Sequence, residues 1–222
     1  MREIFKLLSL ARENRAHRKR LLSLERETLG KFSWYRSLMR ALKKTYRWRS
    51  PFMVSRLARK RVDLPDVDLI YGETPPLTAY QLLSDFGVDQ ADHVVELGGG
   101  SSVFSLVAVC AFGCRATVLE VVPGFVSKTR EVAGQLGLER LTVRQQDFLQ
   151  GELPEGTLYY LTGTTFSEES WRKLQRQMAG APQGTRAVSL SVPLDSKAWK
   201  IESESKLPYS WGENTVYVQV RI

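Results

Sequence analysis

Residues that bind metals or form disulfides are scarce in this chain of 222 residues, which has two cysteines and two histidines. A protein metal site generally needs three or four ligands at suitable spacing, whereas His17 and His93 lie far apart in the sequence. We therefore predict that the chain holds no metal. Cys110 and Cys114 lie close together in a segment that we predict to be helical, so both are expected to be reduced core residues on one face of that helix.

Long apolar runs are also missing. The longest apolar stretch, Val103 to Cys114, is shorter than the roughly 20 residues that a membrane-spanning helix needs. Lys6 and Arg12 interrupt the apolar residues near the N-terminus, which excludes the continuous core of a signal peptide. These absences predict no transmembrane segment and a cytoplasmic protein, associated at most peripherally with a membrane or with nucleic acid.

Positive charge is concentrated in the first part of the chain. Residues 1–61 contain 19 Lys and Arg against 4 Asp and Glu, whereas residues 62–222 contain 13 against 20. The sign changes near Pro65, which ends any helix before it. The sequence therefore predicts a basic helical arm, residues 1–61, and an acidic domain, residues 62–222, large enough for one substantial core.

The basic arm shows helical spacing of apolar residues over residues 1–29, with Gly30 as the expected C-cap. Ser50 followed by Pro51 is typical of a helix N-terminus, and this second helix is expected to run to about Arg61. Basic residues interleaved with aromatic ones suit nucleic acid, an anionic membrane or an acidic protein surface. Alternatively, the arm is a helical cover packed on the domain, and the two interpretations are compatible. The aromatic residues of the arm include Trp34, Tyr35, Tyr46, Trp48 and Phe52.

A short strand, a glycine turn and a helix follow one another between His93 and Phe112. Glu96 lies near the end of the strand, directly before the three glycines Gly98–Gly100. No Lys follows these glycines, so the turn is not a P-loop. The pattern E/D-x-G-x-G-x-G is typical of S-adenosylmethionine binding, and the chain matches it except that Ser102 replaces the third glycine, where it either crowds the cofactor or shifts the turn. A glycine turn also occurs as plain α/β architecture, so the motif alone leaves both interpretations open.

Strand-like and helical segments alternate along the rest of the domain. This order, ending in a hairpin, predicts an α/β fold with a twisted, mostly parallel sheet and an antiparallel edge. The expected strands after His93–Leu97 cover residues 115–122, 141–143, 156–161 and 187–192, the hairpin covers 199–222, and the expected helices cover 77–86 and 123–136, with one more opening at Ser167.

Polar side chains fall at the carboxyl ends of these strands, where ligands of such sheets bind. Glu120 lies about 20 residues beyond the glycines, a spacing that suits hydrogen bonds from ribose hydroxyls. Asp147 and Phe148 follow the third strand and can offer an acceptor to the amine of adenine and an aromatic edge to its ring. Thr162 follows the fourth strand. Because all of them gather at one edge of the sheet, a cofactor site is favoured over plain architecture.

Set beside the glycine turn, the loop Tyr71-Gly72-Glu73-Thr74 resembles the Y-G-E-T loop of the non-SET histone-lysine methyltransferases, the disruptor-of-telomeric-silencing family. The resemblance covers about residues 66–222. The Y-G-E-T loop is its specific element, because the other motifs are shared by many class I methyltransferases. The matching segments are Glu96 to Ser102, Glu120, Gln146 to Phe148, Thr162 to Phe166, Ser210-Trp211 and Tyr217. The chain departs from the family at Ser102, at Thr162 in place of Asn and at Thr164 in place of Phe.

The resemblance implies a Rossmann-like class I methyltransferase fold, with S-adenosyl-L-methionine as the cofactor and a protein lysine as the methyl acceptor. It also implies two sets of site residues. The catalytic set is Thr162, Phe166, Trp211 and Tyr217. The cofactor-binding set is Tyr71, Gly72, Glu73, Thr74, Glu96, Leu97, Gly98, Gly99, Gly100, Ser101, Glu120, Val121, Asp147 and Phe148.

A lysine acceptor must be neutral, and its ordinary pKa of about 10.4 opposes this at neutral pH. A desolvated channel walled by Phe166, Trp211 and Tyr217 would lower that pKa, so no dedicated base is required. Alternatively, Trp211 and Tyr217 only pack within the hairpin. Two other functions stay open: a methyltransferase for a small molecule or lipid at a membrane surface, and a binding protein that has the fold but has lost turnover.

Overall fold

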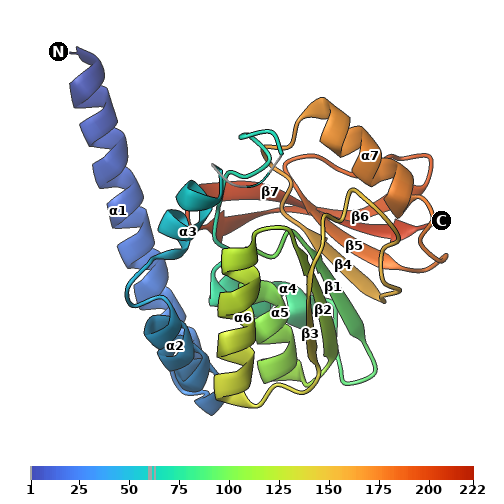
Figure 1. Ribbon diagram of the computed structural model, residues 1–222, viewed down its shortest axis with the longest axis horizontal. Helices are drawn as coiled ribbons and strands as arrows, with labels where there is room; N and C mark the ends of the chain where they lie inside the picture. The colour runs from blue at the N-terminus through green and yellow to red at the C-terminus, as the bar shows by residue number, and fades with distance from the viewer. Residues whose placement is uncertain (1, 60–61, 63) are drawn as a thin grey trace.

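The computed structural model describes residues 2–59, 62 and 64–222. A seven-stranded sheet runs through its centre in the order β3-β2-β1-β4-β5-β7-β6 (Figure 1). The strands β3, β2, β1, β4 and β5 are parallel, and β7 pairs antiparallel with both β5 and β6. The predicted fold is therefore confirmed. The strands are β1 (His93–Leu97), β2 (Arg115–Glu120), β3 (Leu141–Gln145), β4 (Leu158–Leu161), β5 (Arg186–Leu190), β6 (Trp199–Tyr209) and β7 (Gly212–Arg221).

Helices cover both faces of the sheet because successive strand residues point to opposite faces. On one face, Val94 and Tyr160 pack in a core with α4, α5 and the π-helical segment η1, and Val118 packs beside them against α6. On the other face, Val95 and Tyr159 pack against α7 (Figure 1). These helices are α4 (Pro76–Asp85), α5 (Val103–Val107), η1 (Ala108–Phe112), α6 (Pro123–Leu136) and α7 (Glu168–Met178).

One detail of the predicted helix after the glycine turn was wrong. Gly113 has φ 67, a left-handed conformation that ends η1, so Cys114 lies beyond the helix and does not share a face with Cys110. Both cysteines are free. Burial raises the pKa of both thiols to about 11, which makes them poor nucleophiles at neutral pH.

Three helices precede α4: α1 (Arg2–Leu29), α2 (Ser33–Thr45) and α3 (Pro51–Ala58). The predicted cap of α3 is confirmed, since the Met53 backbone N–H donates to Ser50 Oγ over 3.3 Å. The helix ends at Ala58, earlier than expected. Arg61 and Asp63, at the predicted boundary between arm and domain, lie outside the described residues, so that boundary stays a prediction.

Helix α2 was not expected from the sequence. Its Leu38 and Ala41 belong to the same core as η1, and Thr45 at its end donates to Glu131 of α6 over 2.9 Å. The N-terminal part of α1 extends away from the rest of the molecule (Figure 1). Within the described ranges, no helix has the length and apolar character needed to cross a membrane.

Candidate active site

A cleft with two lobes lies at the carboxyl ends of β1, β2 and β4. The larger lobe has a volume of about 420 Å³ and the smaller lobe about 90 Å³. They form one cleft because several residues line both. The shared lining is Ile70, Tyr71, Gly98, Gly100, Thr162 and Thr165.

The glycine turn forms the floor of both lobes. Gly98 has φ 74 and Gly100 has φ 53, which are left-handed conformations that favour glycine. A Cβ on Gly100 would also come within 2.6 Å of the Tyr71 ring. The absence of side chains here leaves the backbone open to a ligand in the cleft.

Ser102, at the position of the third glycine, also has a left-handed backbone, with φ 56. Its side chain is fully buried, and its Oγ lies 3.1 Å from Thr129 Oγ1 of α6. It lines neither lobe. The serine therefore keeps the turn in the conformation that a glycine would adopt, and it does not crowd the cleft.

Glu96 is a buried carboxyl group that lines the larger lobe. Its Oε2 accepts a hydrogen bond from the Ser105 backbone N–H over 3.0 Å. Burial raises the pKa of Glu96 to about 7, against its ordinary 4.5, although the hydrogen bond opposes this change. A cation in the larger lobe would favour the ionised form.

Glu120 lines the smaller lobe and holds the glycine turn at the same time. Its Oε2 accepts from the Gly100 backbone N–H over 2.6 Å, and its Oε1 accepts from Val122 over 2.7 Å. Burial raises the pKa of this carboxyl group, and the two backbone donors oppose the rise. Each carboxylate oxygen can accept a further bond, so ribose hydroxyls remain possible donors.

The smaller lobe continues to the end of β3. Asp147 and Phe148 line it, and the Leu149 backbone N–H donates to Asp147 Oδ1 over 2.9 Å. Phe166, predicted for the acceptor channel, lines this lobe as well, with its ring centroid 5.8 Å from that of Phe148. Phe166 therefore lies on the side of the predicted adenine contacts.

The Y-G-E-T loop closes the larger lobe. The Tyr71 hydroxyl lies 2.7 Å from Ser101 Oγ, and its ring stacks on Phe125 of α6 with centroids 5.0 Å apart. Burial pushes the pKa of Tyr71 well above its ordinary value, so the phenol stays neutral. Gly72 lies against the Trp211 ring, where a Cβ would approach to 2.2 Å. The loop thus joins the glycine turn to the C-terminal hairpin.

Glu73 is the exception within this loop. It lines a separate cavity of about 240 Å³ below α1, together with Arg18 and Glu25. Glu73 lines neither lobe of the cleft, so the structure does not indicate a direct contact between its side chain and a ligand in the cleft. The assignment of Glu73 to the cofactor-binding set stays a prediction, and its Oε1 accepts a hydrogen bond from the Tyr71 hydroxyl over 3.3 Å.

Trp211 lines the larger lobe, whereas Tyr217 lines neither lobe. Tyr217 pairs with Ser189 in the middle of β7. Because side chains alternate along a strand, Tyr217 points to the face opposite Asn214, which does line the larger lobe. Asn214 is held there by Ser191, whose Oγ donates to Asn214 Oδ1 over 2.8 Å.

The cleft brings together most of the predicted set. Asn214, Ser191 and Ile70 also line the cleft but were not predicted from the sequence. Asn214 could have been found, because it follows the turn at Gly212 and lies on the same face of the strand as Val216. The predicted residues that line a lobe are Tyr71, Gly72, Thr74, Glu96, Leu97, Gly98, Gly99, Gly100, Ser101, Glu120, Val121, Asp147, Phe148, Thr162, Phe166 and Trp211. Within the part of the chain that the structure describes, no group of three or more His, Cys, Asp or Glu side chains is placed to hold a metal.

The strand order, together with the glycine turn at the carboxyl ends of the parallel strands, is that of the Rossmann-like fold of class I methyltransferases. No protein-family model matches the chain. Over 81 residues it is 32% identical to acetylserotonin O-methyltransferase of Bos taurus, a match that covers 36% of this chain and 23% of that enzyme's length.

Solved structures are similar over more of the chain. An RNA methyltransferase from Salinibacter ruber, crystallised with S-adenosyl-L-homocysteine, is 25% identical with a TM-score of 0.57 over 67% of this chain and 92% of that one. TrmN from Thermus thermophilus is 17% identical with a TM-score of 0.59, over 75% of this chain and 53% of that one. These similarities confirm the predicted fold class.

Proposed function

We propose that this protein is an S-adenosyl-L-methionine-dependent methyltransferase that uses the two-lobed cleft. The observation that carries the proposal is the pair of buried carboxyl groups, Glu96 and Glu120, at the ends of adjacent parallel strands on either side of an open glycine turn. The donor chemistry fits this cofactor. Glu96 suits its ammonium group, Glu120 suits its ribose hydroxyls, and Asp147 with Phe148 suits its adenine.

The cofactor supplies an activated methyl group, so the task of the protein is alignment and exclusion of water. The far side of the larger lobe offers neutral hydrogen-bonding groups and one indole ring. These groups come from Thr162, Thr164, Thr165, Ser191, Asn214 and Trp211. They can orient a polar acceptor without adding a charge of their own.

The lining favours an amine acceptor over a hydroxyl. Among the described residues around the larger lobe, Glu96 is the only carboxyl group, and none is His or Lys. A hydroxyl needs a base to remove its proton, whereas a neutral amine attacks directly and gives its proton to solvent afterwards. Desolvation beside Trp211 would favour the neutral form of the amine.

A protein lysine is the amine that the Y-G-E-T resemblance implies, and we keep it as the first candidate acceptor. The second candidate is a small amine or an amine-bearing lipid. It is supported by the lining of the larger lobe, which lacks Phe166 and Tyr217 and is therefore less aromatic than the channel that the resemblance implies. Incubation with methyl-labelled cofactor and separated protein, lipid and small-molecule fractions distinguishes the two.

Replacement of Gly100 by Ala tests the cofactor site. The added Cβ meets the Tyr71 ring at 2.6 Å in a backbone conformation that disfavours any side chain, so we expect cofactor affinity to fall at least tenfold by calorimetry. Gly137→Ala is the matched control, because Gly137 has a similar φ of 63 with nothing within 4 Å of its Cβ. Equal affinities for the two variants, or no binding by the unaltered protein at millimolar cofactor, would refute the proposed site.

A further inference from the structure

The outer face of α3 is apolar, although it faces solvent. Val54, Ser55 and Ala58 point inward, whereas Phe52, Met53 and Leu57 are exposed. Trp48, in the turn just before α3, is 81% exposed. A surface helix ordinarily places polar residues outward, so the large apolar side chains gathered here form an exposed apolar cluster. We call Trp48, Phe52, Met53 and Leu57 the α3 patch.

The charged residues on α3 and in the turn just before it all have one sign. Arg47, Arg49, Arg56 and Arg59 are exposed beside it. In the sequence, no Asp or Glu occurs between Glu27 and Asp63. The Arg47 guanidinium lies 4.5 Å from the centroid of the Trp48 ring. A partner that covers this patch must therefore offer both apolar contact and negative charge.

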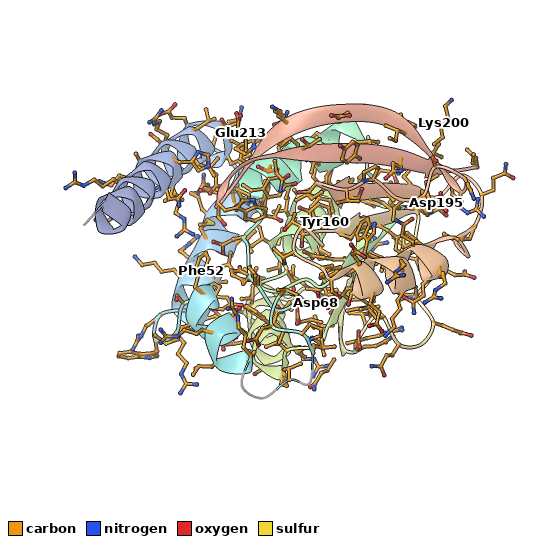
Figure 2. The ribbon with its side chains drawn as sticks, turned by 90° about the horizontal axis from the view of Figure 1, so that it is seen from above. Phe52, Asp68, Tyr160, Asp195, Lys200 and Glu213 are labelled. Atoms are coloured by element: carbon orange, nitrogen blue, oxygen red, sulfur yellow. The ribbon has the colours of Figure 1, made fainter. Side chains whose placement is uncertain are left out.

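The patch continues to the mouth of the cleft. Ser55 of α3 donates to the Leu69 carbonyl over 2.9 Å, which fixes the segment that carries the exposed Val67 and Ile70. Ile70 lines both lobes. Figure 2 labels Phe52 on α3 and, nearer the middle of the view, Asp68 of this segment. A surface that covers the α3 patch would lie against the opening of the cleft.

We propose that the α3 patch binds an anionic lipid bilayer and presents the cleft to its surface. The exposed aliphatic side chains favour a bilayer over nucleic acid, because they gain from contact with acyl chains and nothing from phosphates. Trp flanked by Arg is typical of the membrane interface, and basic residues near an anionic surface add attraction. The further idea that the protein takes its methyl acceptor from that surface rests on the proposed methyltransferase function. Bilayer binding itself does not rest on it.

Vesicle co-sedimentation of the full-length protein tests the proposal. We expect binding to phosphatidylcholine vesicles that contain phosphatidylserine, weak binding to pure phosphatidylcholine, and loss of binding as salt rises. Trp48→Ala combined with Leu57→Gln should weaken binding roughly tenfold or more. Ile201→Gln on β6 is the matched control, since Ile201 is 43% exposed and Leu57 is 40% exposed. This control should bind vesicles like the unaltered protein.

A second pair of variants tests the charges. Arg47→Gln with Arg56→Gln should reduce binding to the anionic vesicles by roughly 25-fold, at about fivefold for each basic residue. Arg144→Gln with Arg176→Gln removes two exposed arginines elsewhere and should have little effect. Cofactor affinity should be unchanged in all these variants, which separates this test from that of the proposed function.

Three outcomes would overturn the proposal: no binding to the anionic vesicles, equal loss in the α3 and control variants, or salt-sensitive binding to RNA or duplex DNA without binding to vesicles. Self-association that disappears in the Trp48→Ala, Leu57→Gln variant, measured by light scattering, would instead identify the patch as an interface between two copies of the chain. If the unaltered protein also fails to bind the anionic vesicles, that result refutes bilayer binding.

Discussion

Cofactor affinity should depend on pH through Glu96. The carboxyl group is buried in the larger lobe, and burial raises its pKa to about 7. The ammonium group of the cofactor would interact favourably with the ionised form of Glu96 but not with the protonated form. Binding is therefore expected to release a proton from Glu96 wherever the free protein holds one.

The size of the effect follows from that pKa. At pH 6 roughly nine tenths of the Glu96 carboxyl groups are protonated, and at pH 8 roughly one tenth. Apparent affinity should thus be about tenfold lower at pH 6 than its limit at high pH. Proton release should fall from about 0.9 per bound cofactor at pH 6 to about 0.1 at pH 8.

The stability of the free protein should change in the opposite direction. A carboxyl group whose folded pKa of about 7 exceeds its ordinary 4.5 stabilises the fold in its protonated form. That contribution is complete below about pH 4.5 and is lost as pH rises to about 7, which amounts to about 3 kcal/mol. The raised pKa of Glu120 acts in the same direction. Cofactor should therefore raise the melting temperature more at pH 8 than at pH 6.

Calorimetry with S-adenosyl-L-homocysteine, in buffers of different ionisation enthalpy, measures both affinity and proton release. Glu96→Gln should bind more weakly at pH 8 and release no proton from this position. Glu73→Gln is the control, because burial also raises the pKa of Glu73 but its side chain lies outside both lobes. Flat affinity between pH 6 and 8 in the unaltered protein, or an unchanged pH profile in Glu96→Gln, would refute this reasoning.

Two further predictions concern the turn and the acceptor lobe. Ser102→Ala and Ser102→Gly both lose the bond to Thr129, but only alanine places a Cβ on the left-handed backbone, so Ser102→Ala should be less stable than Ser102→Gly by about 1 kcal/mol in denaturant. Cofactor affinity should be unchanged in both variants, and equal stability would contradict this reasoning. Trp211→Ala should reduce methyl transfer with little change in cofactor affinity, whereas Tyr217→Ala, outside the lobe, should retain transfer. Equal losses of transfer in the two variants would show that the hairpin acts only through packing.

Strands buried on both faces were predictable because their apolar runs are bounded by turn residues. β1 matches its predicted bounds, and so does α6, which begins at Pro123 and ends before Gly137, a residue with φ 63. Helix α2 was missed although Leu38 and Ala41 have helical spacing. Phe32 supplies no side-chain cap at its start, and the basic and aromatic residues of α2 were interpreted as a binding pattern.

Side-chain directions within the cleft depended on contacts that no local pattern encodes. The loop that carries Phe166 is fixed by Asp68, whose Oδ1 accepts from the Ser167 backbone N–H over 2.7 Å although 99 residues separate them. Tyr217 points away from the cleft because of the register between β7 and β5. Glu73 is turned toward a cavity formed with α1. Each of these depends on tertiary packing.

The two carboxyl groups at the strand ends are the part of the cleft that folding explains least well. Burial raises the pKa of both Glu96 and Glu120, which means that ionising them inside the protein costs free energy. Apolar side chains at these two positions would extend the core at no such cost. The free-energy cost of ionising Glu120 is partly offset, because its carboxylate accepts hydrogen bonds from two backbone N–H groups at the turn and at Val122. Glu96 has one such donor and faces the larger lobe, so its charge is matched only when a cation occupies that lobe.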